Sequence, residues 1–191
     1  INNVDAFVHN EWNINTKSDD IVTLSLGLRA NYWGYNNEIN VSPRAGIAYK
    51  PSWSDDMLFR LSGGVYVQPP FYRELRKFDG SLVGPDDAST QKSYQVVFTH
   101  EYNFKAWDRP FVLTSEVYYK YLKDIIPYEV DNVRIKYFAD QKATGYAAGM
   151  DMRINGEFVK GIESWASLSI MKSEENIKYY LSPTGTILSQ N

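Results

Sequence analysis

The amino-acid sequence predicts an all-β protein of antiparallel up-and-down strands. Three observations favour this fold: apolar and polar residues alternate over long runs, turn-forming residues separate the runs, and aromatic residues make up 15% of the chain. No run approaches the roughly 20 apolar residues that a transmembrane helix needs. No positively charged start followed by an apolar run marks a signal peptide either.

The alternation is clearest over residues 21–33. One face of this strand would hold Val22, Leu24, Leu26, Leu28, Ala30 and Tyr32, and the other would hold Thr23, Ser25, Gly27, Arg29 and Asn31. The pattern repeats over residues 145–158 and more loosely over 4–11, 44–50 and 57–68. Three further strands are expected at 94–105, 111–123 and 162–172. The sequence therefore predicts about eight strands, each with one apolar and one polar face.

Composition narrows the function classes. The 191 residues carry 20 basic and 23 acidic side chains, a formal charge of −3, so a nucleic-acid partner is not expected. The chain has no cysteine, which removes disulfides, thiol nucleophiles and cysteine metal sites. Its two histidines, His9 and His100, lie far apart and show neither metal-ligand nor triad spacing. We expect no enzyme, no cofactor and no metal site.

The links between the strands alternate in length. Short links are expected at 15–20, 51–56, 106–110 and 160–161, and longer ones at 34–40, 69–91, 125–141 and in the tail from Glu174. All short links then fall at one end of the sheet. Bacterial outer-membrane barrels have tight periplasmic turns, long extracellular loops and aromatic girdles near the strand ends. The sequence thus predicts a transmembrane β-barrel segment in the outer membrane, whose first strand runs towards the periplasm.

Two other architectures stay open at this point. A soluble or surface-attached β-sandwich that binds carbohydrate through exposed Trp and Tyr would also alternate apolar and polar residues. Strand length favours the barrel, because sandwich strands usually run about 5–6 residues. A complete eight-stranded barrel is the second alternative.

Short motifs along the chain resemble the barrel of TonB-dependent outer-membrane receptors. They are Gly27-Leu28-Arg29 with Tyr32, Val41-Ser42-Pro43-Arg44, Ala48-Tyr49-Lys50-Pro51, Arg60-Leu61-Ser62-Gly63-Gly64-Val65-Tyr66, Gln68-Pro69-Pro70, Tyr72-Arg73-Glu74-Leu75, Glu116-Val117-Tyr118-Tyr119-Lys120, Leu122-Lys123-Asp124, Ile126-Pro127-Tyr128, Ala143-Thr144-Gly145, Gly149-Met150-Asp151 and Trp165-Ala166-Ser167-Leu168-Ser169. No single motif is diagnostic, but their order and spacing carry the resemblance over nearly the whole chain.

The resemblance implies a barrel of about 22 strands around a plug domain. Residues 1–191 would then supply about eight of the strands, with the plug and the other strands lying outside this chain. It implies uptake of a scarce nutrient, such as an iron chelate, cobalamin or a glycan. The implied partners are the TonB energy-coupling system acting through the plug, outer-membrane lipid, and a small-molecule or glycan substrate. No TonB-contact segment and no terminal strand ending in an aromatic residue is recognisable.

Two sets of residues are candidates for function. Charged residues expected to face the lumen are Arg29, Arg44, Arg60, Glu116, Lys120, Asp151, Arg153 and Glu157. Pairing with one another or with a plug in a hydrated interior is favoured for them over direct substrate contact. Ligand-binding candidates in the longest loop are Phe71, Tyr72, Arg73, Glu74 and Arg76. Aromatic rings beside guanidinium groups suit a sugar, a chelate carboxylate or a peptide.

The loop residues and the acidic pairs each have an alternative interpretation. Tyr72 and Arg73 are equally compatible with folding the loop back onto the barrel, and residues 72–78 with a turn or two of helix. The acidic pairs are expected to be solvated turn formers rather than calcium ligands, since calcium needs 6–8 oxygens around it. These pairs are Asp19-Asp20, Asp55-Asp56, Asp86-Asp87 and Glu174-Glu175.

Overall fold

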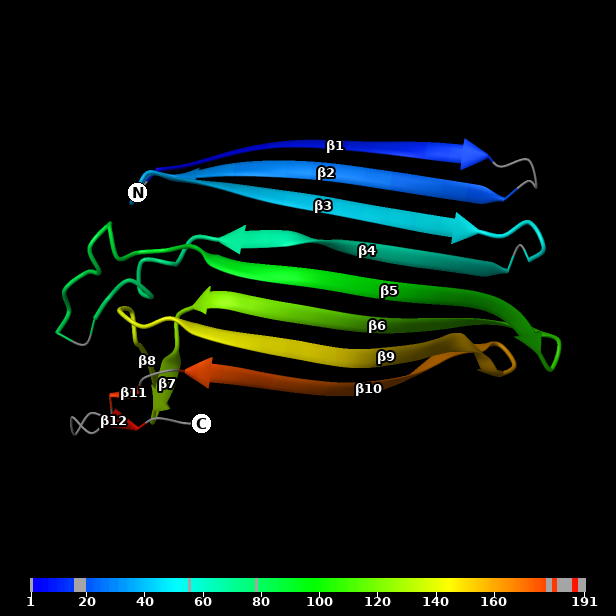
Figure 1. Cartoon of the computed structure of the whole chain (residues 1–191). Coiled ribbons are helices and arrows are strands. Elements are labelled where there is room, and N and C mark those ends of the chain that lie inside the picture. Colours follow the sequence, from blue (N-terminus) through cyan, green and yellow to red (C-terminus); the bar gives the residue numbers. More distant parts are fainter. Residues whose placement is uncertain are drawn as a thin grey trace.

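Eight long strands form one antiparallel sheet, which confirms the predicted all-β, up-and-down fold (Figure 1). The structure is a computed structural model that describes residues 2–15, 20–54, 56–77, 79–177, 180–181 and 187–188. Strands that follow one another in the chain are neighbours in the sheet, apart from β6, which pairs with β9. Within the described ranges there is no helix, and hence none that is long and apolar enough to cross a membrane.

The strands of the sheet have 12 to 17 residues, more than twice the usual length of about 5–6. They are β1 (Asn3–Asn15), β2 (Ile21–Trp33), β3 (Glu38–Lys50), β4 (Met57–Gln68), β5 (Gln91–Ala106), β6 (Arg109–Ile125), β9 (Ala143–Val159) and β10 (Ile162–Ile177). Two small hairpins are formed by β7 (Tyr128–Asp131) with β8 (Arg134–Tyr137) and by β11 (Tyr180–Leu181) with β12 (Ile187–Leu188).

The sheet is open and has a single layer. Its order runs β1-β2-β3-β4-β5-β6-β9-β10, so β1 and β10 are its edges. A complete eight-stranded barrel would pair these two strands, and the described residues show no such pairing, so that alternative is wrong. The long strands also do not divide into two packed sheets, as a sandwich would require.

The connections confirm the alternation of short and long links, with three corrections. One end of the sheet carries the link between β3 and β4 and the turns at 107–108 and 160–161, and the opposite end carries the links between β4 and β5 and between β6 and β9 (Figure 1). Of the predicted short links at 15–20 and 51–56, residues 16–19 and 55 lie outside the described residues. The expected long link at 34–40 is wrong, because residues 34–37 make a tight turn in which Asn37 has φ 59°. The long link at 125–141 contains the β7–β8 hairpin. The expected tail from Glu174 begins later, because β10 continues to Ile177.

Register sorts the side chains onto two faces, because residues directly opposite each other in an antiparallel ladder point to the same side. Leu26 lies opposite Ala45, and Leu61 lies opposite Phe98. We call the surface that carries Leu26 and every residue in register with it the apolar face. The reverse surface, which carries Arg29 and the residues in register with it, is the polar face.

No second layer covers the apolar face. Its central side chains are about half exposed, from 43% for Phe98 and 44% for Leu26 to 65% for Ile170. The core of a sandwich would bury such residues almost completely. The described core instead lies near the end of the sheet that carries the long loops, around Trp33 and Leu75.

The ladder is interrupted between β3 and β4. Pairing joins only residues 44–49 of β3 to residues 59–64 of β4, although β2–β3 and β4–β5 pair along their whole length. The pairing stops at Pro43, which has no N–H to donate. Beyond this point the two strands diverge towards the long loops (Figure 1). We call residues 38–43 and 65–68 the β3–β4 split.

Gly64 permits the close approach at the base of this split. A Cβ on Gly64 would lie 2.8 Å from the Pro43 carbonyl oxygen and 2.9 Å from Arg44 Cγ. We therefore expect Gly64→Val to lower the free energy of unfolding by about 1–3 kcal/mol, since backbone must move to admit the side chain. Urea unfolding followed by tryptophan fluorescence measures this. Gly84→Ala is the control, because only Asp87 Oδ2, at 3.8 Å, would meet the new methyl group; equal losses for the two variants would contradict the assignment.

Candidate functional site

The apolar face carries a continuous band of aromatic rings at the end of the sheet with the short turns. Neighbouring rings are 4.8 to 6.4 Å apart between centroids, and the band crosses five adjacent strands, β3 to β6 and β9. Its members in order are Tyr49, Phe59, His100, Tyr102, Phe104, Phe111 and Phe158. Such contacts fix the rings against the sheet and against one another.

A second group of aromatic residues lies on the apolar face near the long loops. Tyr94 and Tyr121 have ring centroids 6.2 Å apart, and Tyr119 and Tyr146 are 6.2 Å apart as well. Between the two groups the face is mainly aliphatic, with residues such as Leu26, Val96, Val117, Met150 and Ile170. Aromatic rings at both ends of an apolar stripe, several of them with a polar group, suit surroundings that are dry in the middle and wet at either end.

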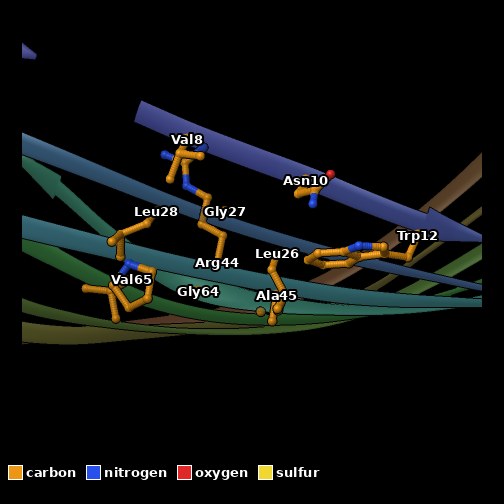
Figure 2. A pocket seen from close by; sticks show the side chains of 12 residues that line it. Val8, Asn10, Trp12, Leu26, Gly27, Leu28, Arg44, Ala45, Gly64 and Val65 are labelled. Carbon is orange, nitrogen blue, oxygen red and sulfur yellow. The ribbon is translucent and has the colours of Figure 1, made fainter. Parts of the chain in front are cut away.

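The apolar face is hollowed between β1–β2 and β3–β4. The hollow has a volume of about 600 Å³ and lies over the small residues Ala45 and Gly63. Figure 2 shows Val8, Trp12 and Leu28 around it, with Asn10 beside them. Asn10 and Arg44 also line the hollow, and its other lining residues carry neither amide nor charged side chains.

The charged residues predicted to face the lumen all lie on the polar face. Each stands at a register position in step with Arg29 rather than with Leu26. Glu157 adjoins the irregular pairing near residues 162–164 and accepts the Gly161 N–H at 3.4 Å. The shared face does not by itself show that it lines a lumen, so that role stays a prediction.

Several of these charges contact neighbours on the same face. Arg29 is paired with Asp5 at 2.9 Å, and Asp5 also accepts an N–H of Asn31 at 3.0 Å. The Arg44 guanidinium lies 4.3 Å from the centre of the Tyr66 ring. Further contacts are Thr99 with Glu116 at 3.4 Å, Lys120 over Tyr118 at 5.2 Å, Arg153 with Asn155 at 2.9 Å and Arg153 over Trp165 at 5.3 Å.

The loop between β4 and β5 folds back onto the sheet. Leu75 and Val83, each 1% exposed, pack with Trp33 of β2, which is also 1% exposed. Ala88 and Ala139 complete this cluster, so the loop at 126–142 contributes to the same core. Folding of the loop back onto the barrel was one of two predicted roles for Tyr72 and Arg73, and in the structure Leu75 and Val83 have the main packing role.

Buried polar contacts fix the C-terminal end of this loop. The Thr90 hydroxyl is fully buried and lies 3.0 Å from Glu38 Oε1 and 2.9 Å from Asn40 Oδ1, donating its one hydrogen to either acceptor in turn. Asn36 donates to the Ala88 carbonyl at 3.0 Å, and Tyr35 donates to the Val83 carbonyl at 2.5 Å. The loop is thereby tied to the turn at 34–37 and to the start of β3.

Glu74 and Phe71, two of the ligand-binding candidates, have different surroundings. Glu74 is partly buried and accepts the Phe71 backbone N–H at 2.8 Å and an N–H of Gln91 at 3.3 Å. Glu74 therefore shapes the loop. Phe71 is 59% exposed and presents its ring to the outside.

The other three candidates, Tyr72, Arg73 and Arg76, take part in contacts between a guanidinium group and an aromatic ring. Arg76 lies 5.3 Å from the centre of the Tyr72 ring and donates to the Tyr72 hydroxyl at 3.3 Å. Arg73 lies 5.8 Å from the ring of Tyr137, in β8, which links the two long loops. Residues 72–75 form turns rather than a helix, and Phe78 lies outside the described residues.

Asp79 fixes a local turn in the same loop. One of its carboxylate oxygens accepts the Ser81 hydroxyl at 2.6 Å and the Ser81 N–H at 2.9 Å, which lowers the pKa of Asp79 below 3.8. Because this pKa is depressed in the folded protein, the carboxylate stabilises the turn above pH 3.8 and that contribution is lost as the pH falls through the lowered pKa.

The two histidines lie on opposite faces. His9 is opposite Gly27 on the polar face, and His100 stacks against Phe59 at 4.8 Å on the apolar face. Across the described residues, no group of three or more His, Asp or Glu is placed to hold a metal ion. Among the acidic pairs, Asp20 accepts the Ser52 N–H at 2.7 Å, Asp86 and Asp87 are exposed, and Asp19 and Asp55 lie outside the described residues.

A polar pocket of about 360 Å³ lies at the β3–β4 split. Most of its lining residues belong to the polar face, whereas Val67 and Lys92 stand at register positions of the apolar face. The pocket has no local signature in the sequence, because its residues come from five strands and from a ladder that stops midway. Its lining is Arg29, Ser42, Arg44, Tyr66, Val67, Gln68, Gln91, Lys92, Ser93, Gln95, Leu122 and Ile125. The one local signal for folded-back structure near it is Trp33, a large aromatic residue at a polar-face position of β2.

Comparison with solved structures finds a likeness to a copper transporter, OprC. The TM-score is 0.61 at 16% sequence identity, and the match covers 89% of this chain and 28% of the transporter chain. This chain therefore has the fold of part of that transporter and spans little more than a quarter of its length. No family model matches the chain, and no curated protein matches it either.

The buried Thr90 contacts give a test of how the long loop is held. We expect Thr90→Val to destabilise the loop locally by about 1–3 kcal/mol, because it leaves Glu38 and Asn40 without their hydroxyl partner. Limited proteolysis within residues 69–90 should then speed up about 5- to 150-fold. Asp86→Asn, an exposed change in the same loop, should leave the rate unchanged; equal cleavage of both variants would contradict this role for Thr90.

Proposed function

We propose that this chain is part of the wall of an outer-membrane transport barrel, with its apolar face in contact with lipid. The observation that carries the proposal is a single-layered sheet whose long apolar face is uncovered and is bounded at both ends by aromatic side chains. In water such a surface would be an aggregation hazard, whereas in a bilayer it is in its favourable solvent.

The spacing of the aromatic groups fits a membrane. Phe111 and Tyr121 lie on the apolar face of β6, ten positions apart. At about 3.3 Å per residue they are separated by about 33 Å along the strand. With a strand tilt of about 40°, this corresponds to about 25 Å along the membrane normal, which is the usual height of the apolar band of outer-membrane barrels. The longest strands continue beyond this band, so the long loops lie well outside the bilayer.

The remaining strands and a plug domain are proposed to lie outside this chain. Support comes from the two long unpaired edges at β1 and β10, since an exposed strand edge in lipid leaves backbone groups unsatisfied. The ordered sequence motifs and the likeness to part of the transporter OprC agree with this proposal. We propose import of a scarce nutrient without covalent chemistry, driven by the TonB system through the plug. The likeness to OprC supports a role in transport, and we do not extend its copper specificity to this chain.

The described loops give a candidate first contact for the substrate. Exposed Phe71 lies in the same turn region as Tyr72 and Arg76, whose ring and guanidinium are held together. Aromatic faces and fork-shaped donors on a rigidly anchored loop suit an iron chelate, cobalamin or a glycan. The polar face behind the loop would provide a hydrated route past the plug.

Single-cysteine labelling tests which face meets lipid, since the chain has no cysteine of its own. A nitroxide at Leu26→Cys should be accessible to oxygen dissolved in lipid, and one at Ser25→Cys to a water-soluble nickel reagent. Val96 and Gln95 on β5 form a matched second pair. A nitroxide at Leu26 in water together with one at Ser25 in lipid would overturn the proposal.

Depth measurements test the position of the aromatic groups. Among labels on the apolar face of β6, one at Val117→Cys should lie deepest, and labels at Leu113→Cys and Tyr121→Cys should lie nearer the two membrane surfaces. The expected difference is several ångströms, because each residue advances about 3.3 Å along a tilted strand. A steady increase in depth from one end of β6 to the other would be incompatible with a spanning strand.

A further inference from the structure

The pocket at the β3–β4 split results from the interruption of the ladder. Had the register continued, Ser42 would lie opposite Tyr66, yet pairing stops at Arg44 and Gly64. The strands diverge, and the pocket formed there is also lined by residues of β5 and β6. Polar side chains and unpaired strand backbone therefore surround a volume of about 360 Å³, within the range of small-molecule sites.

The charge of this pocket is of one sign. It is lined by Arg29, Arg44 and Lys92, and no carboxylate is present among its described lining residues. Two of these cations have partners outside the lining: Arg29 pairs with Asp5 at 2.9 Å, and Lys92 lies 3.8 Å from Glu38. Arg44 has no ion pair with any described residue, so its charge is the one most available to a ligand.

The neighbours of Arg44 prepare it for binding. The Tyr66 ring, 4.3 Å away, supports one face of the guanidinium plane and limits its motion. Its N–H groups remain free to bind a carboxylate in a two-point contact. Gln68, Gln91 and Gln95 add amide donors around the pocket, and Leu122 and Ile125 supply an apolar side to it.

We propose that this pocket binds a small organic anion, with carboxylate groups on Arg44 and a carbon skeleton against Leu122 and Ile125. A purely inorganic anion would use the cations and leave the apolar side unused. The inference rests on the proposed function, in which the polar face is the substrate side of the wall, and it narrows the substrate class to carboxylate-bearing compounds.

Binding of tricarballylate, a flexible tricarboxylate, tests the proposal. The intact protein that contains this chain is titrated in detergent micelles at low ionic strength by isothermal calorimetry. Arg44→Gln should weaken tricarballylate binding by about 10-fold or more, since a charge-assisted two-point contact is lost. Arg44→Lys should give an intermediate loss, because lysine keeps the charge without the planar fork. Tyr66→Leu should also weaken tricarballylate binding, because it removes the ring that holds the Arg44 guanidinium in place.

Arg60→Gln is the matched control. Arg60 lies on the same face, on β4 opposite Thr99, and does not line the pocket, so its loss should change affinity less than about 2-fold. The neutral triamide of tricarballylate should not bind measurably. Equal losses in Arg44→Gln and Arg60→Gln, binding of the triamide, or phosphate binding as tight as that of tricarballylate would each overturn the proposal. Circular dichroism verifies that every variant is folded.

Failure of this inference is distinguishable from failure of the proposed function. A Leu26 label in lipid, together with no binding of tricarballylate, would contradict carboxylate binding by the pocket and would support the barrel wall. Carboxylate binding that depends on Arg44, together with a Leu26 label in water, would contradict the membrane assignment and would support the pocket.

Discussion

The register of the antiparallel ladder is the constraint on which the structure depends. Side chains alternate with a period of two, so slipping one strand by a single residue would move its apolar set onto the polar face. The pairings hold Leu26 beside Ala45 and Leu61 beside Phe98. That regularity produces two chemically different surfaces from one layer of backbone, and it places the aromatic band of five strands in one line.

The interruption of the same ladder produces the features that most concern function. Where β3 leaves β4, backbone pairing is replaced by side-chain contacts that span the split. The Thr90 hydroxyl lies within hydrogen-bond distance of the Glu38 carboxylate, and Lys92 of β5 lies beside the same carboxylate. The anchored loop and the polar pocket therefore share an origin in Pro43 and Gly64, one of which ends the pairing while the other allows the closest approach.

Loop packing shows how an exposed connection can be well ordered. Leu75 and Val83 insert beside Trp33, and the Arg73–Tyr137 contact joins the two long loops. Candidate ligand-binding groups such as Phe71 are thus displayed from a fixed base. A rigid base lowers the ordering cost of binding.

The local sequence pattern, an alternation with a period of two interrupted by turn-forming residues, predicted the strands, their two faces and the alternation of link lengths except at 34–40. It also placed Arg29, Arg44 and Arg60 on one face. The open edges, the tight turn at 34–37, the β3–β4 split and the anchoring role of Thr90 became visible only in the folded chain. Those depend on which strands meet and where pairing stops, and such contacts join residues about 50 positions apart.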